Sequence, residues 1–184
     1  LGTGHAVMQT AELLKDFAGT VMIICGDTPL LDGCELKKFY VEHQASGAAA
    51  TVLTAILDNP TGYGRILRDC NGHVIGIVEE KDATMSQKSI CEINTGIYCI
   101  EAPLLFEALS GLTCDNAQGE YYLTDVLGKL NEMGKFVGGV ITADSDMIMG
   151  INSRRQLADA ETIMHTRILD KLMDQGVTIM DPAS

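Results

Sequence analysis

Three polar residues in this 184-residue sequence stand where their side chains can reach a ligand. Asp27 follows the apolar run VMIIC at 21–25, and Glu79 follows VIGIV at 74–78. Asn94 lies inside the strand-like run INTGIYCI, where asparagine is disfavoured and needs hydrogen-bond partners. Carboxylate and amide oxygens suit a hard cation or the hydroxyl groups of a sugar. Asp27 is equally explained as a turn residue, because GDTP is also typical of turns.

Glycines occupy two further places where the backbone could approach a ligand. Gly2 and Thr3 precede the first expected helix, and Gly62 and Gly64 flank Tyr63. Without a Cβ, glycine lets the chain come close to an anion or a flat ring. Simpler explanations are a helix N-cap by Thr3 and a bend that leads into a hairpin.

Two other polar groups have structural explanations. For Asn152, in GINSR, a helix N-cap is the preferred explanation and a ligand role is the alternative. Asp144 and Asp146 form a D-x-D pattern like that of some glycosyltransferase metal sites, but we interpret it as a polar loop. No Ser-His-Asp or metal-binding histidine spacing stands out.

The elements that must position these side chains alternate between strands and helices. Strands are expected at 21–25, 49–56, 64–68, 74–79, 93–100 and 136–142, and helices at 4–17, 34–45, 103–110, 121–133 and from Ser153 to about Gln175. Asn71-Gly72 predicts a hairpin between the third and fourth strands. Asp32 and Gly47 predict the start and end of the second helix. The alternation indicates an α/β sheet, whose ligands bind beyond the carboxyl ends of its strands.

Composition excludes several classes of protein. A net charge of −12 argues against a nucleic-acid-binding protein. No apolar run reaches the roughly 18 residues of a membrane span, and the N-terminal LGTGHAV has no basic region of a signal peptide. The six cysteines form no C-x-x-C pair, so neither a zinc site nor a redox pair is expected. A reduced, cytoplasmic compartment fits this cysteine pattern best.

Seven blocks, in order, extend over nearly the whole chain: LGTGHAV, GDTPLL, PTGYGRI, GIVEEKDAT, EINTGIY, NAQGEYYLTDV and GINSRRQLADAE. With these blocks the sequence resembles the N-terminal uridyltransferase domain of the bacterial bifunctional UDP-N-acetylglucosamine pyrophosphorylase / glucosamine-1-phosphate N-acetyltransferase family. The resemblance implies a Rossmann-like nucleotidyltransferase fold of the glycosyltransferase-A type, a mixed sheet with helices on both faces and a β-hairpin insertion. It also implies a reaction of UTP with N-acetylglucosamine 1-phosphate that gives UDP-N-acetylglucosamine and pyrophosphate, with Mg²⁺, towards peptidoglycan and lipopolysaccharide precursors.

The same resemblance implies roles for individual residues. Asp27 matches the metal-binding aspartate of the family, and Asn152 matches the asparagine that completes the metal site. Substrate contacts are implied at Gly2 and Thr3 for the uracil, Cys25 and Gly26 beside the ribose and metal, Gly64, Glu79 and Asn94 for the sugar, and Tyr122 and Thr124 near the sugar phosphate. No protein nucleophile and no general base are implied, since the attacking phosphate oxygen is already ionised and the reaction needs positioning and charge neutralisation.

The family pattern also has parts that these residues do not contain. A glycine-rich loop, G-x-G-T-x-M, and a glutamine that reads the uracil would precede Leu1, so the fold is expected to lack its first βα unit. A left-handed β-helix, which carries the acetyltransferase site and builds most of the family's homotrimer, would follow DPAS. We therefore expect a uridyltransferase domain over 1–152, a helix and linker over 153–184, and weak or no activity of these residues alone.

Two alternatives stay open from the sequence. A pyrophosphorylase for another sugar phosphate would use the same Asp27, but Glu79 and Asn94 would read a different sugar. A non-catalytic binding or assembly module would keep the sugar pocket without the phosphate loop. Comparing glucose 1-phosphate with N-acetylglucosamine 1-phosphate separates the first, and comparing ligand binding with turnover separates the second.

Overall fold

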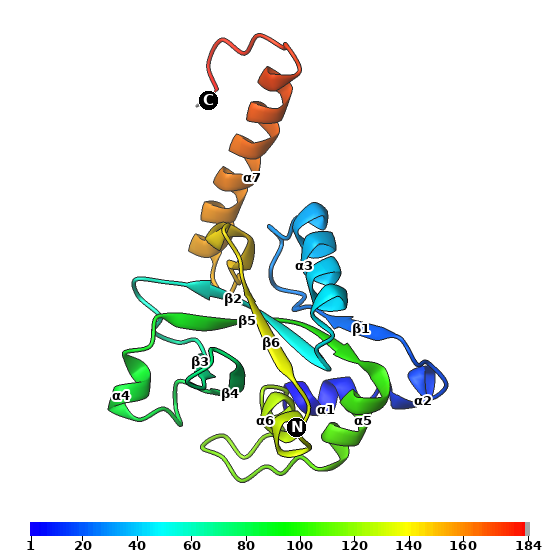
Figure 1. Ribbon diagram of the computed structural model, residues 1–184. Helices are drawn as coiled ribbons and strands as arrows, with labels where there is room; N and C mark the ends of the chain where they lie inside the picture. The colour runs from blue at the N-terminus through cyan, green and yellow to red at the C-terminus, as the bar shows by residue number, and fades with distance from the viewer. Residues whose placement is uncertain (183–184) are drawn as a thin grey trace.

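A computed structural model describes residues 1–182 as a mixed sheet with helices packed on both of its faces (Figure 1). The strands are β1 (Thr20–Ile23), β2 (Ala50–Ile56), β3 (Arg65–Arg68), β4 (Val74–Val78), β5 (Glu92–Glu101) and β6 (Val137–Ile141). The helices are α1 (Thr3–Met8), α2 (Ala11–Leu14), α3 (Gly33–Ser46), α4 (Met85–Lys88), α5 (Ala102–Ser110), α6 (Asp125–Glu132) and α7 (Arg154–Asp174), with a 3₁₀ turn η1 (Ser145–Ile148). The predicted α/β class and mixed sheet are confirmed.

Strand β5 is the centre of the sheet. Along one edge it pairs antiparallel with β2, which in turn pairs parallel with β6. Its other edge is shared: β1 pairs with Tyr98–Glu101, whereas β3 meets β5 at Ile93 and continues into β4. Among the residues that the structure describes, no strand pairs with this edge between Ile93 and Tyr98. The sheet therefore has a gap there, flanked by β1 and β3.

Two apolar clusters hold the layers together. One packs α5 and α6 against one face of the sheet, where Ile100, Leu105 and Leu127 are fully buried. The other lies on the opposite face, where Phe39 of α3 packs with Ile97 and their neighbours. Helix α7 projects away from the sheet in Figure 1. No helix within residues 1–182 has both the length and the hydrophobicity to span a bilayer.

Local capping and turn chemistry acts as the sequence predicts. The Asp32 carboxylate accepts hydrogen bonds from the backbone N–H groups of Cys34 (2.7 Å) and Glu35 (3.1 Å), which starts α3. Gly47 ends the helix in the left-handed conformation, with φ of 66°. Strands β3 and β4 pair antiparallel, which confirms the hairpin predicted from the Asn-Gly pair.

Two predicted helices differ from the structure. The single helix expected over 4–17 is wrong, because α1 ends at Met8 and α2 begins only at Ala11. At this break the Thr10 hydroxyl donates to the carbonyl oxygen of Val7 at 2.7 Å, a side-chain bond that competes with the helical pattern. The helix expected from 121 begins at Asp125, which leaves Leu123 and Thr124 outside the helix, in the wall of a cavity.

Candidate active site

Two cavities open at the gap in the sheet. The larger, of about 560 Å³, extends from β5 towards α1. The smaller, of about 430 Å³, extends from β5 towards the loop before β3 and the segment before α7. They share five lining residues, which come from the end of β1, the end of β4 and the edge of β5: Cys25, Asp27, Glu79, Asn94 and Gly96. The pair therefore forms one continuous site at the carboxyl end of β1.

Asp27 is an exposed residue whose position is fixed through its backbone. Its carbonyl oxygen accepts a hydrogen bond from the N–H of Ile151 at 2.8 Å, which ties it to the segment before α7. A Cβ on Gly150 would lie 3.5 Å from Asp27 Oδ2 and 3.7 Å from Asn152 Nδ2, so these two side chains flank the same glycine. Within residues 1–182 neither side chain makes a hydrogen bond, so both are free to bind a ligand.

The prediction that Asn152 caps α7 is wrong. Ser153 is the N-cap, and its hydroxyl accepts from the N–H of Gln156 at 3.2 Å. The backbone N–H of Asn152 donates to the side chain of Gln156 at 2.9 Å. The serine takes the capping role because it directly precedes the first helical residue, Arg154, whereas Asn152 lies one residue too early. The amide of Asn152 is thereby left in the wall of the smaller cavity.

Glu79 is a half-buried hydrogen-bond acceptor with a fixed orientation. Its Oε1 accepts from the hydroxyl of Thr124 at 3.2 Å. Its Oε2 lies 3.3 Å from where a Cβ on Gly64 would be, so this glycine leaves room for the carboxylate. Burial raises the pKa of Glu79, and the neighbouring charges of Asp125 and Asp82 add to this increase.

Asn94 has one engaged and one free end. Its Oδ1 accepts from the N–H of Gly96 at 3.0 Å and from the hydroxyl of Tyr98 at 2.9 Å. Gly96 has φ of 78°, and a Cβ there would lie 2.7 Å from the Cys25 sulfur, so only glycine suits this position. Burial and the charge of Asp27 raise the pKa of the Cys25 thiol.

Nine of the eleven predicted site residues line the two cavities: Thr3, Cys25, Gly26, Asp27, Gly64, Glu79, Asn94, Thr124 and Asn152. Gly2 does not; a Cβ on it would lie 2.8 Å from the carbonyl oxygen of Tyr121, so it permits close backbone packing. Tyr122 also lies outside both walls, and its hydroxyl contacts Gln118 at 2.9 Å and Asp82 at 3.4 Å. Thr3 accepts from the N–H of Leu123 at 3.1 Å.

Sequence reasoning missed Tyr98, which lines the larger cavity although it is only 2 % exposed. A signal was present in the sequence. Asn94, Gly96 and Tyr98 are two residues apart, so in a strand they lie on the same face. The apolar context of INTGIYCI instead made Tyr98 look like an ordinary core residue.

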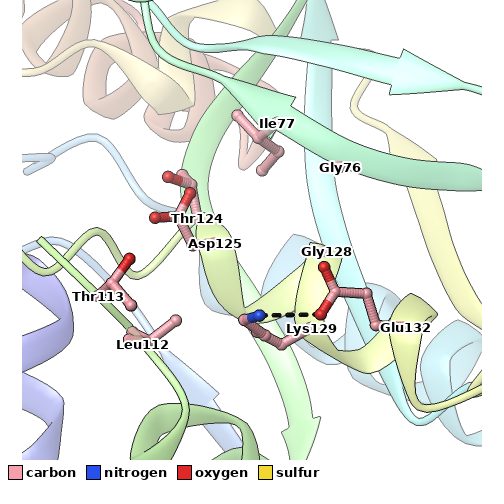
Figure 2. A pocket seen from close by; sticks show the side chains of 9 residues that line it. All are labelled: Gly76, Ile77, Leu112, Thr113, Thr124, Asp125, Gly128, Lys129 and Glu132. Carbon is pink, nitrogen blue, oxygen red and sulfur yellow. Dashed lines mark hydrogen bonds and ion pairs between the residues drawn. The ribbon is translucent and has the colours of Figure 1, made fainter. Parts of the chain in front are cut away.

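A third, smaller hollow of about 220 Å³ lies against α6 (Figure 2). Thr124 lines both this hollow and the larger cavity, so it forms part of the wall between them. The 2.8 Å ion pair between Lys129 and Glu132 lies in its lining. Asp125 also lines it, and burial raises the pKa of this carboxyl, with a further increase from the charge of Asp82.

The site is acidic and contains no cationic side chain. Within the described residues, no lysine or arginine lines either of the two main cavities, whereas Asp27 and Glu79 line both. No three His, Cys, Asp or Glu side chains within residues 1–182 come together as a metal-binding cluster. Two carboxylates with amides and hydroxyls can recognise polar ligands, but phosphate groups there would need an added cation.

Known proteins share both the sequence and the fold. The profile of the nucleotidyl transferase family matches residues 1–147. The chain is 55% identical over 182 residues to the bifunctional protein GlmU of Syntrophotalea carbinolica, covering 99% of this chain and 39% of that protein. It is 54% identical over 184 residues to GlmU of Heliobacterium modesticaldum, covering 100% of this chain and 40% of that protein. The chain thus spans about two fifths of the length of these relatives.

A solved structure supports the fold alone. A crystal structure from Bacillus anthracis, assigned as a glucose-1-phosphate thymidylyltransferase in complex with sucrose, superposes with a TM-score of 0.65 at 20% identity, covering 88% of this chain and 60% of that one. The family profile extends over most of the chain, and it includes all strands of the sheet and every predicted site residue except Asn152. The chain belongs to the nucleotidyl transferase family.

Proposed function

We propose that this chain carries the N-acetylglucosamine-1-phosphate uridyltransferase site of a bifunctional GlmU-type enzyme. The substrates would be UTP and N-acetylglucosamine 1-phosphate, and the products UDP-N-acetylglucosamine and pyrophosphate. The observation that carries this proposal is the free carboxylate of Asp27 at the junction of two cavities, which gives a nucleotide and a sugar phosphate separate places beside one metal ligand. The identity to GlmU proteins supports the choice of substrates.

The donor set at this junction fits a divalent cation, and we propose Mg²⁺. Mg²⁺ prefers hard oxygen ligands, takes few of them from protein, and leaves the remaining positions to phosphates and water. Asp27 and Asn152 would hold it through a carboxylate and an amide oxygen, since both side chains flank Gly150 and are otherwise free. When bound, the cation would neutralise negative charge on the phosphate groups.

The residues of the chain would act by binding and orienting the substrates. Thr3 and Gly26 line the larger cavity, where the uridine would lie. Glu79, held by Thr124, would accept hydrogen bonds from sugar hydroxyls, and Asn94 would bind the same sugar from the edge of β5. The sugar-phosphate oxygen would attack the α-phosphorus of UTP in line while pyrophosphate leaves, so no side chain needs to remove a proton.

The test is turnover by the full-length protein. UTP and N-acetylglucosamine 1-phosphate should give UDP-N-acetylglucosamine and pyrophosphate, whereas glucose 1-phosphate should react at least about tenfold less efficiently, because the site would then leave a polar group unpaired. Chelation of divalent cations should stop the reaction, and added Mg²⁺ should restore it. Equal use of both sugar phosphates would contradict the proposed sugar, and binding of UDP-N-acetylglucosamine without turnover would favour a non-catalytic module.

A further inference from the structure

The amide of Asn94 can have only one orientation in this structure. The N–H of Gly96 is a donor, and it points at one atom of the amide from 3.0 Å. That atom must therefore be the oxygen, which only accepts hydrogen bonds. It follows that the hydroxyl of Tyr98, 2.9 Å from the same oxygen, is the donor of its bond.

The other end of the amide is left for a ligand. Within residues 1–182, Nδ2 of Asn94 has no hydrogen-bond partner. It is not a buried atom, in contrast to Nε of Arg65, which is both buried and unpaired. Asn94 itself is half-buried and lines both main cavities. Its exposed end therefore offers N–H donors to the site and no acceptor.

Tyr98 is well suited to keep this orientation. It is 2 % exposed, pairs with Ile23 of β1 and Val52 of β2, and belongs to the core cluster under α5 and α6. A hydroxyl on a ring packed in this way has little freedom, so its bond fixes the amide. Burial also raises the pKa of Tyr98, so the hydroxyl keeps its proton.

We propose that Tyr98 is a positioning residue: with the N–H of Gly96, it holds Asn94 as a pure hydrogen-bond donor facing the sugar end of the substrate. This inference rests on the proposed function. The group of the sugar that meets Asn94 must then be an acceptor, such as the carbonyl oxygen of an acylamino substituent. Glu79, which also lines both cavities, supplies the complementary acceptor for hydroxyl donors.

The first test is Tyr98→Phe in the full-length protein. Loss of one hydrogen bond should raise the KM for N-acetylglucosamine 1-phosphate about three- to tenfold, with kcat and the KM for UTP changed less than about twofold. The matched control is Tyr40→Phe, because Tyr40 is 40% exposed on α3, away from the site, and should leave all three constants unchanged. Unchanged kinetics in Tyr98→Phe would refute the positioning role.

The second test separates positioning from a general effect on the fold. If Tyr98 acts through Asn94, then Tyr98→Phe should raise KM less than about twofold in an Asn94→Ala background. A purely structural role predicts instead the full three- to tenfold effect in that background, and this outcome would overturn the proposal even if Tyr98→Phe lowers the melting temperature. Failure of the wild-type protein to turn over UTP would overturn the proposed function itself, and it would be seen before any variant is compared.

Discussion

The side chain of Asp27 contributes to the site without contributing to the hydrogen bonding of the fold. It is exposed and unpaired within the described residues, whereas its backbone carbonyl holds Ile151. Asp32, five residues later, shows the opposite arrangement, because its carboxylate caps α3. The Asp27 side chain is thus available to a ligand, whereas the Asp32 side chain stabilises the fold.

Asp27→Ala in the full-length protein should lower kcat about 100-fold or more, because the proposed metal ligand is lost. Its melting temperature should stay close to that of the wild type, since no hydrogen bond of the fold is removed. Asp32→Ala should do the reverse, with a lower melting temperature and nearly normal kcat, because a helix cap is lost. Kinetics and thermal melting of both variants check this, and unfolding of Asp27→Ala would support the interpretation of Asp27 as a turn residue.

His43 gives the fold a pH dependence. Its ring is buried, with Nδ1 2.8 Å from the Thr51 hydroxyl, and burial lowers its pKa, although the charge of Glu101 partly opposes this. Because the folded state disfavours the proton, the stability from neutral His43 is complete above the unfolded pKa of about 6.5 and is lost as pH falls below it. Between pH 7.5 and 5, the melting temperature of His43→Gln should fall less steeply with pH than that of the wild type. His165→Gln, at an exposed position of α7, is the control and should follow the wild type.

At the scale of elements, the loop at 61–64, which lines the smaller cavity, is tied down by an ion pair between a buried arginine and a partly exposed glutamate. Arg65, at the start of β3, is 2 % exposed; it bonds to Glu80 at 2.6 Å and to the carbonyl oxygen of Tyr63. Glu80 also accepts from the N–H of Gly62 at 3.3 Å, and Arg65 lowers the pKa of this carboxyl. The Arg65–Glu80 pair therefore joins the end of β4 to the loop with Gly62 and Gly64, which precedes β3.

Glu80→Ala should lower the melting temperature by several degrees, because it leaves the buried guanidinium of Arg65 without its partner. It should also raise the KM for the sugar phosphate, since the loop with Gly64 loses an anchor. Glu42→Ala, an exposed glutamate on α3, is the control and should melt like the wild type. A Glu80→Ala variant with wild-type melting and KM would show that the ion pair does not hold the loop.

The elements that the sequence predicted well are those fixed by nearby residues. Asp32 and Gly47 set the ends of α3, and the Asn-Gly pair sets the β3–β4 hairpin. The gap in the sheet was not predictable in this way, because it depends on pairing between Ile23 and Tyr98, which are far apart in sequence. Asp27 and Glu79 were found from the strands they follow. The contact between Tyr98 and Asn94 was missed although the two residues are close in sequence, because the apolar run INTGIYCI made Tyr98 look like an ordinary core residue.

At the scale of the whole molecule, charge limits what residues 1–184 can do alone. The chain has a net charge of −12, and the described walls of both main cavities contain no lysine or arginine. A triphosphate would meet two carboxylates there, and one divalent cation neutralises only part of the combined charge. For the proposed reaction, we therefore expect efficient transfer to depend on further hydrogen-bond donors or positive charge beside the triphosphate.

Residues 1–184 alone should accordingly turn over UTP much more slowly than the full-length protein, by about 100-fold or more in kcat/KM. Both forms should be assayed at the same enzyme concentration with saturating Mg²⁺, and circular dichroism should establish that the shorter form is folded. Rates within a few fold of each other would show that these residues already contain all the groups that the reaction needs.

The gap along β5 also bears on how such a site can change during evolution. Between Ile93 and Tyr98 this edge carries no ladder to β1 or β3. Asn94 meets the chain before β3 through its backbone N–H, which donates to the carbonyl oxygen of Gly64 at 2.9 Å, so a change of its side chain alters the pocket and leaves this contact in place. A change of the proposed sugar contact at Asn94 is thus compatible with the sheet, whereas Gly96, with φ of 78° and a Cβ position 2.7 Å from the Cys25 sulfur, admits no side chain. Descendants of such a chain could diverge in the sugars they accept while inheriting an unaltered sheet.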